Sequence, residues 1–176
     1  VNNFDDFETN KLPLYMTFWG TPSENCWKIE HSCLQLSCIH QRLDDDLEPM
    51  RMDGNLSDDK FVAFLGRRQC SMNTTVTTNM QFTPKSQESA GLAVVQAMNH
   101  QLHIERACEN NQQVVRVVLV TADYAQPPYF PGFTSTTNRT CLCSEPYSND
   151  SIILQVEMHN EDFIIRYGES ENSLKE

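Results

Sequence analysis

The chain has 176 residues, 39% of them hydrophobic, and its 24 Asp and Glu against 13 Lys and Arg give a formal net charge of -11 at pH 7. This length is sufficient for one domain with its own core. The acidic excess repels nucleic-acid phosphates and acidic membrane surfaces, so neutral partners such as sugars, or cations, are favoured. No apolar run approaches the roughly 18 residues of a membrane-spanning helix.

Strand-forming sequence dominates the chain. The segments are rich in Val, Ile, Thr and Phe, and several alternate apolar with polar residues at a period of two. In 74–82, Val76 and Met80 fall on one face and Thr75 and Asn79 on the other, which predicts one core face and one solvent face. The predicted strands are 27–30, 33–38, 61–66, 74–82, 91–98, 101–107, 113–124, 151–158 and 162–167.

Polar turn sequences separate these strands and supply the Pro, Gly, Asn, Asp and Ser that chain reversals need. No long pattern with a helical period interrupts them, and no repeat or linker divides the chain. Many strands joined by polar turns predict an all-β fold, an antiparallel β-sandwich, with residues 1–176 as a single domain. The predicted turns are 21–25, 43–60, 83–91, 110–113, 126–133 and 145–150.

Four Asn-x-Ser/Thr sequons beside seven cysteines predict a secreted, extracellular protein. The chain opens on Val1 and a polar stretch, which we interpret as the start of a mature or processed chain, because no signal peptide is present. The candidate glycosylation sites are Asn55, Asn73, Asn138 and Asn149.

Disulfide bonds are expected in an oxidising compartment. Because seven is an odd number, one thiol is left over or joins another chain, as in a disulfide-linked oligomer. The sequence cannot choose the pairs, although Cys141 and Cys143 are too close to bridge each other readily. The disulfide candidates are Cys26, Cys33, Cys38, Cys70, Cys108, Cys141 and Cys143.

Histidines at 31 and 40 lie among the first three cysteines, but their spacing matches no compact zinc motif, so disulfides are favoured there. The acidic segment 43–60 offers oxygen ligands for Ca²⁺, yet the glycine position of the calcium-loop pattern, counted from Asp44, holds Pro49. A solvated loop is therefore the favoured interpretation. Asp5 and Asp6 are better candidates for a structural calcium ion, the alternative being a turn capped by aspartate.

Catalytic motifs do not stand out in the sequence. There is no Gly-x-Ser-x-Gly elbow, no His-Glu-x-x-His pair and no phosphate-binding loop. Glycoside hydrolysis needs two carboxylates held at a set separation across a cleft, and nothing sets such a pair apart here. We therefore name no catalytic residue in the chain.

Several segments, taken in order, resemble the C-terminal concanavalin A-like β-sandwich, or jelly roll, of β-xylosidases in glycoside hydrolase family 43. The resemblance depends on the ordered set rather than on any one piece, and the late segment 152–170 resembles the family's late hairpin. The matching pieces are Asp5-Asp6-Phe7, Trp19 with Pro22, Leu34 with Leu36, Arg67-Arg68-Gln69, Phe82 with Pro84, and Glu88 with Ala90-Gly91-Leu92.

The resemblance implies a noncatalytic domain. In this family the sandwich normally follows a five-bladed catalytic propeller, packs on it and lends a loop to the rim of the active site. A propeller domain or second chain is thus the implied partner, and the propeller's three carboxylates have no counterparts here. The family's domain also continues past the late hairpin into one or two further strands, which this chain would lack.

Arg67 and Arg68 follow the apolar segment 61–66 and would point to opposite faces of a strand. The resemblance implies that one of them helps the docking or contacts a sugar, but we favour a structural ion pair at a strand end. Aromatic residues at 129, 130 and 133 lie in a proline-rich loop that strand packing does not require. Whether this loop contacts a carbohydrate or a partner, or only packs on the surface, is left open. The residues concerned are Tyr129, Phe130 and Phe133.

Three functions follow from the sequence. The leading hypothesis is an accessory β-sandwich of a secreted β-xylosidase- or arabinofuranosidase-like protein, which supports or binds a carbohydrate-active partner. The second is an extracellular structural protein that assembles through protein–protein contacts. The third is a stand-alone carbohydrate-binding lectin. No cofactor beyond the structural calcium ion is expected.

Overall fold

The structure, a computed structural model, describes residues 7–8, 11–22, 25–40, 42–44, 62–97, 99–124 and 135–176. The chain forms two compact units, Val1–Gln69 and Cys70–Glu176, and each is described by itself; the single domain expected from sequence stays a prediction. Every strand pairing in these ranges is antiparallel, and the helical content is one short 3-10 turn, Glu171–Ser173. The described residues contain no helix with the length and apolar character that a membrane span requires.

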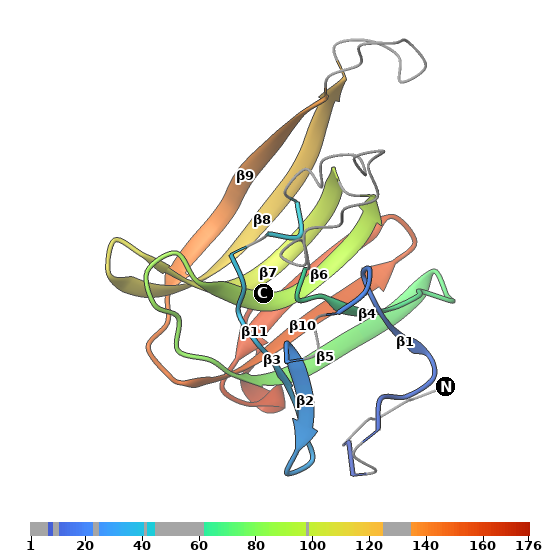
Figure 1. Ribbon diagram of the computed structural model, residues 1–176. Coiled ribbons are helices and arrows are strands. Elements are labelled where there is room, and N and C mark those ends of the chain that lie inside the picture. Colours follow the sequence, from blue (N-terminus) through green and yellow to red (C-terminus); the bar gives the residue numbers. More distant parts are fainter. Residues whose placement is uncertain are drawn as a thin grey trace. The chain divides into compact units, whose positions relative to one another are not determined.

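The first unit holds two small antiparallel sheets (Figure 1). In the β2–β3 hairpin, His31 and Ser32 form the turn with positive φ angles of 52° and 58°, as a two-residue hairpin turn requires. The rings of Trp27 and Phe18 lie 5.3 Å apart, so the half-buried Trp27 packs within this unit. The strands are β1 (Met16–Phe18) paired with β4 (Leu65–Arg67), and β2 (Trp27–Glu30) paired with β3 (Cys33–Leu36).

The second unit is a sandwich of two larger sheets (Figure 1). One sheet has the strand order β6 (Ser89–Ala97), β7 (His100–Glu109), β8 (Gln112–Tyr124) and β9 (Ser135–Pro146). The other has the order β11 (Asp162–Gly168), β10 (Ser151–His159) and β5 (Asn73–Gln81).

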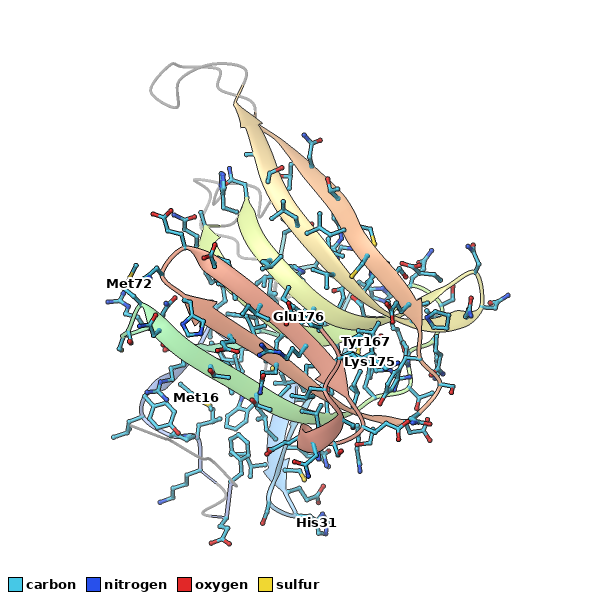
Figure 2. The ribbon with its side chains drawn as sticks, turned by 180° about the vertical axis from the view of Figure 1, so that it is seen from behind. Met16, His31, Met72, Tyr167, Lys175 and Glu176 are labelled. Carbon is cyan, nitrogen blue, oxygen red and sulfur yellow. The ribbon has the colours of Figure 1, made fainter. Side chains whose placement is uncertain are left out.

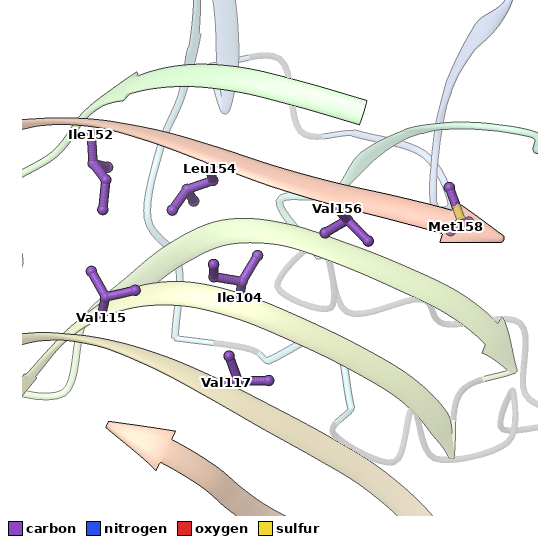
Figure 3. Packing of buried hydrophobic residues seen from close by; sticks show 7 residues of the cluster. All are labelled: Ile104, Val115, Val117, Ile152, Leu154, Val156 and Met158. Atoms are coloured by element: carbon purple, nitrogen blue, oxygen red, sulfur yellow. The ribbon is translucent and has the colours of Figure 1, made fainter. Parts of the chain in front are cut away.

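One layer of aliphatic side chains joins the two sheets (Figure 3). Ile104 from β7 and Val117 from β8 face Leu154 and Val156 from β10. Ile104 and Leu154 are fully buried. Burial of each of these side chains stabilises the fold by roughly 1.5–3 kcal/mol. The all-β antiparallel sandwich predicted from the sequence is thereby confirmed.

Turn chemistry fixes the register of the second unit. Asn110 and Asn111, with φ angles of 50° and 64°, form the two-residue turn between β7 and β8. Asn160, with a φ of 55°, does the same between β10 and β11. Gly91 in β6 pairs with Glu105, and a Cβ there would lie 2.0 Å from the backbone oxygen of Ile104. Only glycine lets β6 approach β7 this closely, which explains the glycine of the 88–92 segment.

Eight of the nine predicted strands are present, with bounds that shift by at most two residues. The segment predicted at 61–66 is a strand only at Leu65–Arg67, and residue 61 lies outside the described residues. The sequence analysis missed β1 and β9, because β1 is only three residues long and β9 is mostly Ser, Thr, Cys and charged residues. Val76 faces inward as expected but is 42% exposed, since β5 is an edge strand.

Truncation of the central core residue tests this packing. Leu154→Ala should lower the free energy of unfolding by about 2–5 kcal/mol, because it leaves a cavity between the sheets. The same substitution at the fully exposed Leu14 should change it by less than about 0.5 kcal/mol. Urea denaturation measures both values, and equal effects would contradict the placement of Leu154.

Candidate functional site

The arginine pair stands at a strand end. Arg67 is the last residue of β4, Arg68 follows it, and both are exposed. The guanidinium carbon of Arg67 lies 4.7 Å from the centre of the Tyr15 ring, which is a cation–π contact. The structural role that we favour for these arginines stays a prediction, as does a role in docking or sugar contact.

Part of the predicted site set lies outside the described residues. This applies to the calcium candidates, the aromatic loop and the first sequon, namely Asp5, Asp6, Tyr129, Phe130, Phe133 and Asn55. Within the described ranges, no three His, Cys, Asp or Glu side chains come together as a metal ion would require. The calcium ion therefore stays a prediction.

All seven cysteines fall within the described ranges, and the structure contains no disulfide bond among them. Cys26 is buried, Cys108 is half-buried, and Cys141 and Cys143 are exposed on the edge strand β9. The thiol of Cys141 donates to the backbone oxygen of Cys143 at 3.3 Å. The disulfides expected in a secreted protein stay a prediction. The remaining three, Cys33, Cys38 and Cys70, are exposed.

Each of the three described sequon asparagines is exposed, as glycosylation requires. Asn73 begins β5, Asn138 lies within β9, and Asn149 lies in the loop between β9 and β10. Their glycosylation stays a prediction.

A cluster of charged side chains occupies the face of the four-stranded sheet opposite the core. Neighbouring residues of a strand point to opposite faces, so Glu105 points away from the core that contains Ile104. Arg116 lies opposite Glu105 on β8, and Arg139 comes from β9. We call Glu105, Arg116 and Arg139 the carboxylate clamp, because the two guanidinium groups converge on one carboxylate oxygen.

The clamp is tight and sheltered from water. Arg116 Nη2 and Arg139 Nη2 lie 2.7 and 2.8 Å from Glu105 Oε1, and the Glu105 side chain is only 8% exposed. Arg116 also donates to Glu109 Oε1 at 2.7 Å. His103 Nδ1 lies 3.9 Å from Glu105 Oε2, beyond hydrogen-bond distance. The clamp thus joins three adjacent strands through charge-assisted hydrogen bonds.

The charge state of Glu105 follows from these contacts. Burial by itself raises the pKa of the carboxyl, but the positive charges of Arg139 and Arg116, together with the hydrogen bond that Arg116 donates, outweigh it and lower the pKa to about 2. Glu105 is therefore ionised at neutral pH. A general acid needs a carboxyl that keeps its proton near the working pH, so Glu105 is unsuited to that role.

A second buried charge holds the loop between β9 and β10. Arg106 is fully buried, and Nη1 donates to the backbone oxygen of Asn149. Nη2 donates to the backbone oxygen of Tyr147 at 3.3 Å and to Gln113 Oε1. The guanidinium carbon lies 5.1 Å from the centre of the Tyr147 ring. These contacts fix the loop from inside the sandwich, and burial lowers the pKa of Arg106.

Two hollows adjoin Tyr167 of β11. Tyr167, Lys175 and Glu176 are labelled in Figure 2. The first, of about 220 Å³, is lined mostly by apolar residues such as Val117 and Ile165, together with Glu145 and Glu176. Tyr167 donates its hydroxyl proton to Glu145, and burial, together with this carboxylate, raises the pKa of Tyr167 to about 12.

The second hollow, of about 410 Å³, is more polar, and we call it the Tyr167 cavity. Aromatic rings and polar side chains share its wall, which is formed by the β9–β10 loop and by the chain after β11. Sequence analysis missed this cavity, because its two sides are about 20 residues apart and no motif links them. The wall includes Tyr147, Asn149, Tyr167, Glu169, Ser173 and Lys175.

Two antiparallel sheets that pack face to face define a β-sandwich. The family model described as "Beta xylosidase C-terminal Concanavalin A-like domain" matches residues 4–176. The chain belongs to this family, which confirms the resemblance found in the sequence.

Solved structures share the fold. The chain is 16% identical to the glycoside hydrolase family 43 protein BlXynB from Bacillus licheniformis, with a TM-score of 0.75. A mutant of BlXynB gives 16% identity and a TM-score of 0.74. In both cases the similarity covers 97% of this chain and 29% of that chain. Comparison with curated proteins finds no match.

Acid pH should weaken the carboxylate clamp. The pKa of Glu105 is about 2 in the folded chain and is expected to return to the ordinary value of 4.5 after unfolding. The folded chain therefore binds this proton more weakly than the unfolded chain does. Protonation therefore favours the unfolded chain. The contribution is complete above about pH 4.5 and is lost as the pH falls toward about 2, a change of about 3 kcal/mol. Denaturant unfolding across this pH range measures the loss.

Glu105→Gln provides the matched comparison, because it removes the titrating group and keeps the shape of the side chain. It should flatten the acid limb of the stability profile. Glu161→Gln, in the exposed turn between β10 and β11, should leave the profile unchanged. An unaltered acid limb in Glu105→Gln would contradict the role of the clamp.

Proposed function

We propose that the chain is a noncatalytic accessory β-sandwich of a secreted glycosidase of the β-xylosidase or arabinofuranosidase kind. The observation that carries the proposal is the family match over residues 4–176, whose description places the domain at the C-terminus of a β-xylosidase. The 29% share of BlXynB that the fold covers agrees with one domain of a larger family 43 protein. A catalytic domain is then the natural partner.

The electrostatics of the sandwich favour support over chemistry. Among the described residues, Glu105 is the carboxylate that burial removes most completely from water, and two arginines neutralise it. The buried Glu105 carboxylate and the two arginines paired with it hold the strands β7, β8 and β9 together. An active site for glycoside hydrolysis instead needs one carboxyl whose pKa is raised and a second that stays ionised.

Secretion is supported by features on the surface of the second unit. Asn73, Asn138 and Asn149 are all exposed, so the folded chain can carry glycans at each of them. The cysteines exposed on β9, Cys141 and Cys143, are accessible to partners that form disulfides. These features suit an extracellular glycoprotein that acts beside a carbohydrate-active partner.

Activity measurements on separate and combined chains test this function. The chain alone should not hydrolyse aryl xylosides or arabinosides. When a family 43 propeller domain from the same source is added or fused, hydrolysis should appear, and the chain should co-purify with that domain. As a control for unfolding, Leu14→Ala should behave as the unaltered chain does, because Leu14 is fully exposed.

Three results would count against the accessory role. Hydrolysis by the chain alone would show an active site of its own. Binding of free oligosaccharides without any association with a propeller would favour the lectin, and an ordered homo-oligomer without either property would favour the assembly protein.

A further inference from the structure

The Tyr167 cavity has the size and the chemistry of a site for a sugar ring. Its volume of about 410 Å³ falls within the roughly 300–1,000 Å³ of small-molecule sites. Tyr147 and Tyr167, whose ring centres lie 6.0 Å apart with the planes at 78°, provide aromatic surface for the C–H groups of a pyranose. Glu169, Ser173 and Lys175 provide hydrogen-bonding groups for hydroxyls and an acetamide.

Asn149, the acceptor of a sequon, forms part of the same wall. Its side-chain amide is exposed to solvent and donates from Nδ2 to Glu169 Oε1. Its backbone oxygen accepts from the fully buried Arg106. One contact holds the side chain of Asn149 at the cavity wall and the other holds its backbone, so the entropy lost when an attached sugar binds in the cavity is reduced.

The other two described sequons lack this setting. Asn73 is exposed at the first position of β5, and Asn138 is exposed within β9. Neither residue lines the Tyr167 cavity or the apolar hollow beside it. A glycan at either position would project from the surface of a strand, whereas a glycan at Asn149 begins at the wall of a preformed cavity.

We propose that the Tyr167 cavity seats the first N-acetylglucosamine of a glycan attached to Asn149. The sugar then forms part of the folded surface and covers Tyr147 and Tyr167. This inference rests on the proposed function, because N-glycosylation requires passage of the chain through a secretory compartment.

The covalent step balances with one named co-reactant, a lipid-linked oligosaccharyl diphosphate. The bond from Asn149 Nδ2 to sugar C1 forms, and the bond from C1 to the phosphate oxygen of the donor breaks. Nδ2 loses one hydrogen as a proton, and the lipid diphosphate leaves with the electron pair. One N–H remains on Nδ2 and can still donate to Glu169, so the contact seen in the structure survives glycosylation.

Site-resolved deglycosylation of the full chain, secreted from a eukaryotic host, tests whether the Tyr167 cavity binds the first sugar of the Asn149 glycan. A peptide N-glycosidase applied to the native protein should release the Asn149 glycan at least about tenfold more slowly than those of Asn73 and Asn138. After denaturation, all three sites should react at similar rates. Mass spectrometry of peptides over time measures each rate.

Thermal unfolding gives the second readout. An endoglycosidase that leaves one N-acetylglucosamine on each site should leave Tm unchanged. Asn149→Gln, which loses the whole glycan, should lower Tm by about 2–4 °C. Asn73→Gln and Asn138→Gln, each of which also loses one glycan, should not. The unglycosylated chain from a bacterial host, compared with its own Asn149→Gln variant, gives the contribution of the amide alone.

The outcomes distinguish a failure of glycan binding in the Tyr167 cavity from a failure of the proposed secretion. An Asn149 glycan that is released as quickly as the others, with no Tm difference, would overturn the seat and leave secretion intact. Glycans on Asn73 and Asn138 but never on Asn149 would overturn it as well. If all four sequons, Asn55 included, are unmodified in a secreted chain, the result would contradict the glycoprotein itself and the proposed glycan site with it.

Discussion

The contact of β10 with β7 and β8 is the constraint on which the second unit depends. A sheet with one apolar face cannot remain in water, and the aliphatic layer around Ile104 and Leu154 covers both inner faces at once. That contact in turn fixes the place of everything outside it. Residues next to the core layer along each strand must face away, and there the sheet carries the carboxylate clamp.

The two arginine systems serve different ends in the same sheet. In the clamp, Arg116 and Arg139 neutralise Glu105 and hold strands together. Arg106 has no carboxylate among its described hydrogen-bond acceptors; it donates to backbone oxygens and so determines the shape of the β9–β10 loop. A buried charge costs free energy unless its donors are satisfied, and this loop accepts two of the hydrogen bonds of Arg106 while Gln113 of β8 accepts a third. The position of Asn149 beside the Tyr167 cavity follows from that requirement.

Periodicity predicted the fold better than the site. Alternation of apolar and polar residues revealed strands such as β3 and β5, and the ordered motifs up to Leu92 led to the family, which the match over residues 4–176 confirms. β9 escaped because an edge strand can be polar on both faces. The clamp and the Tyr167 cavity could not be predicted from the sequence, because they join residues that are distant along the chain and no short pattern encodes such a convergence.

The central claim is that this sandwich works as an accessory part of a glycosidase. Intact mass spectrometry of the native secreted material, with and without reduction, tests it most directly when every co-migrating polypeptide is identified. The account predicts a family 43 propeller in the same particle, either continuous with this chain or as a second chain. A chain that travels alone, or as a disulfide-linked homo-oligomer without a propeller, would contradict it.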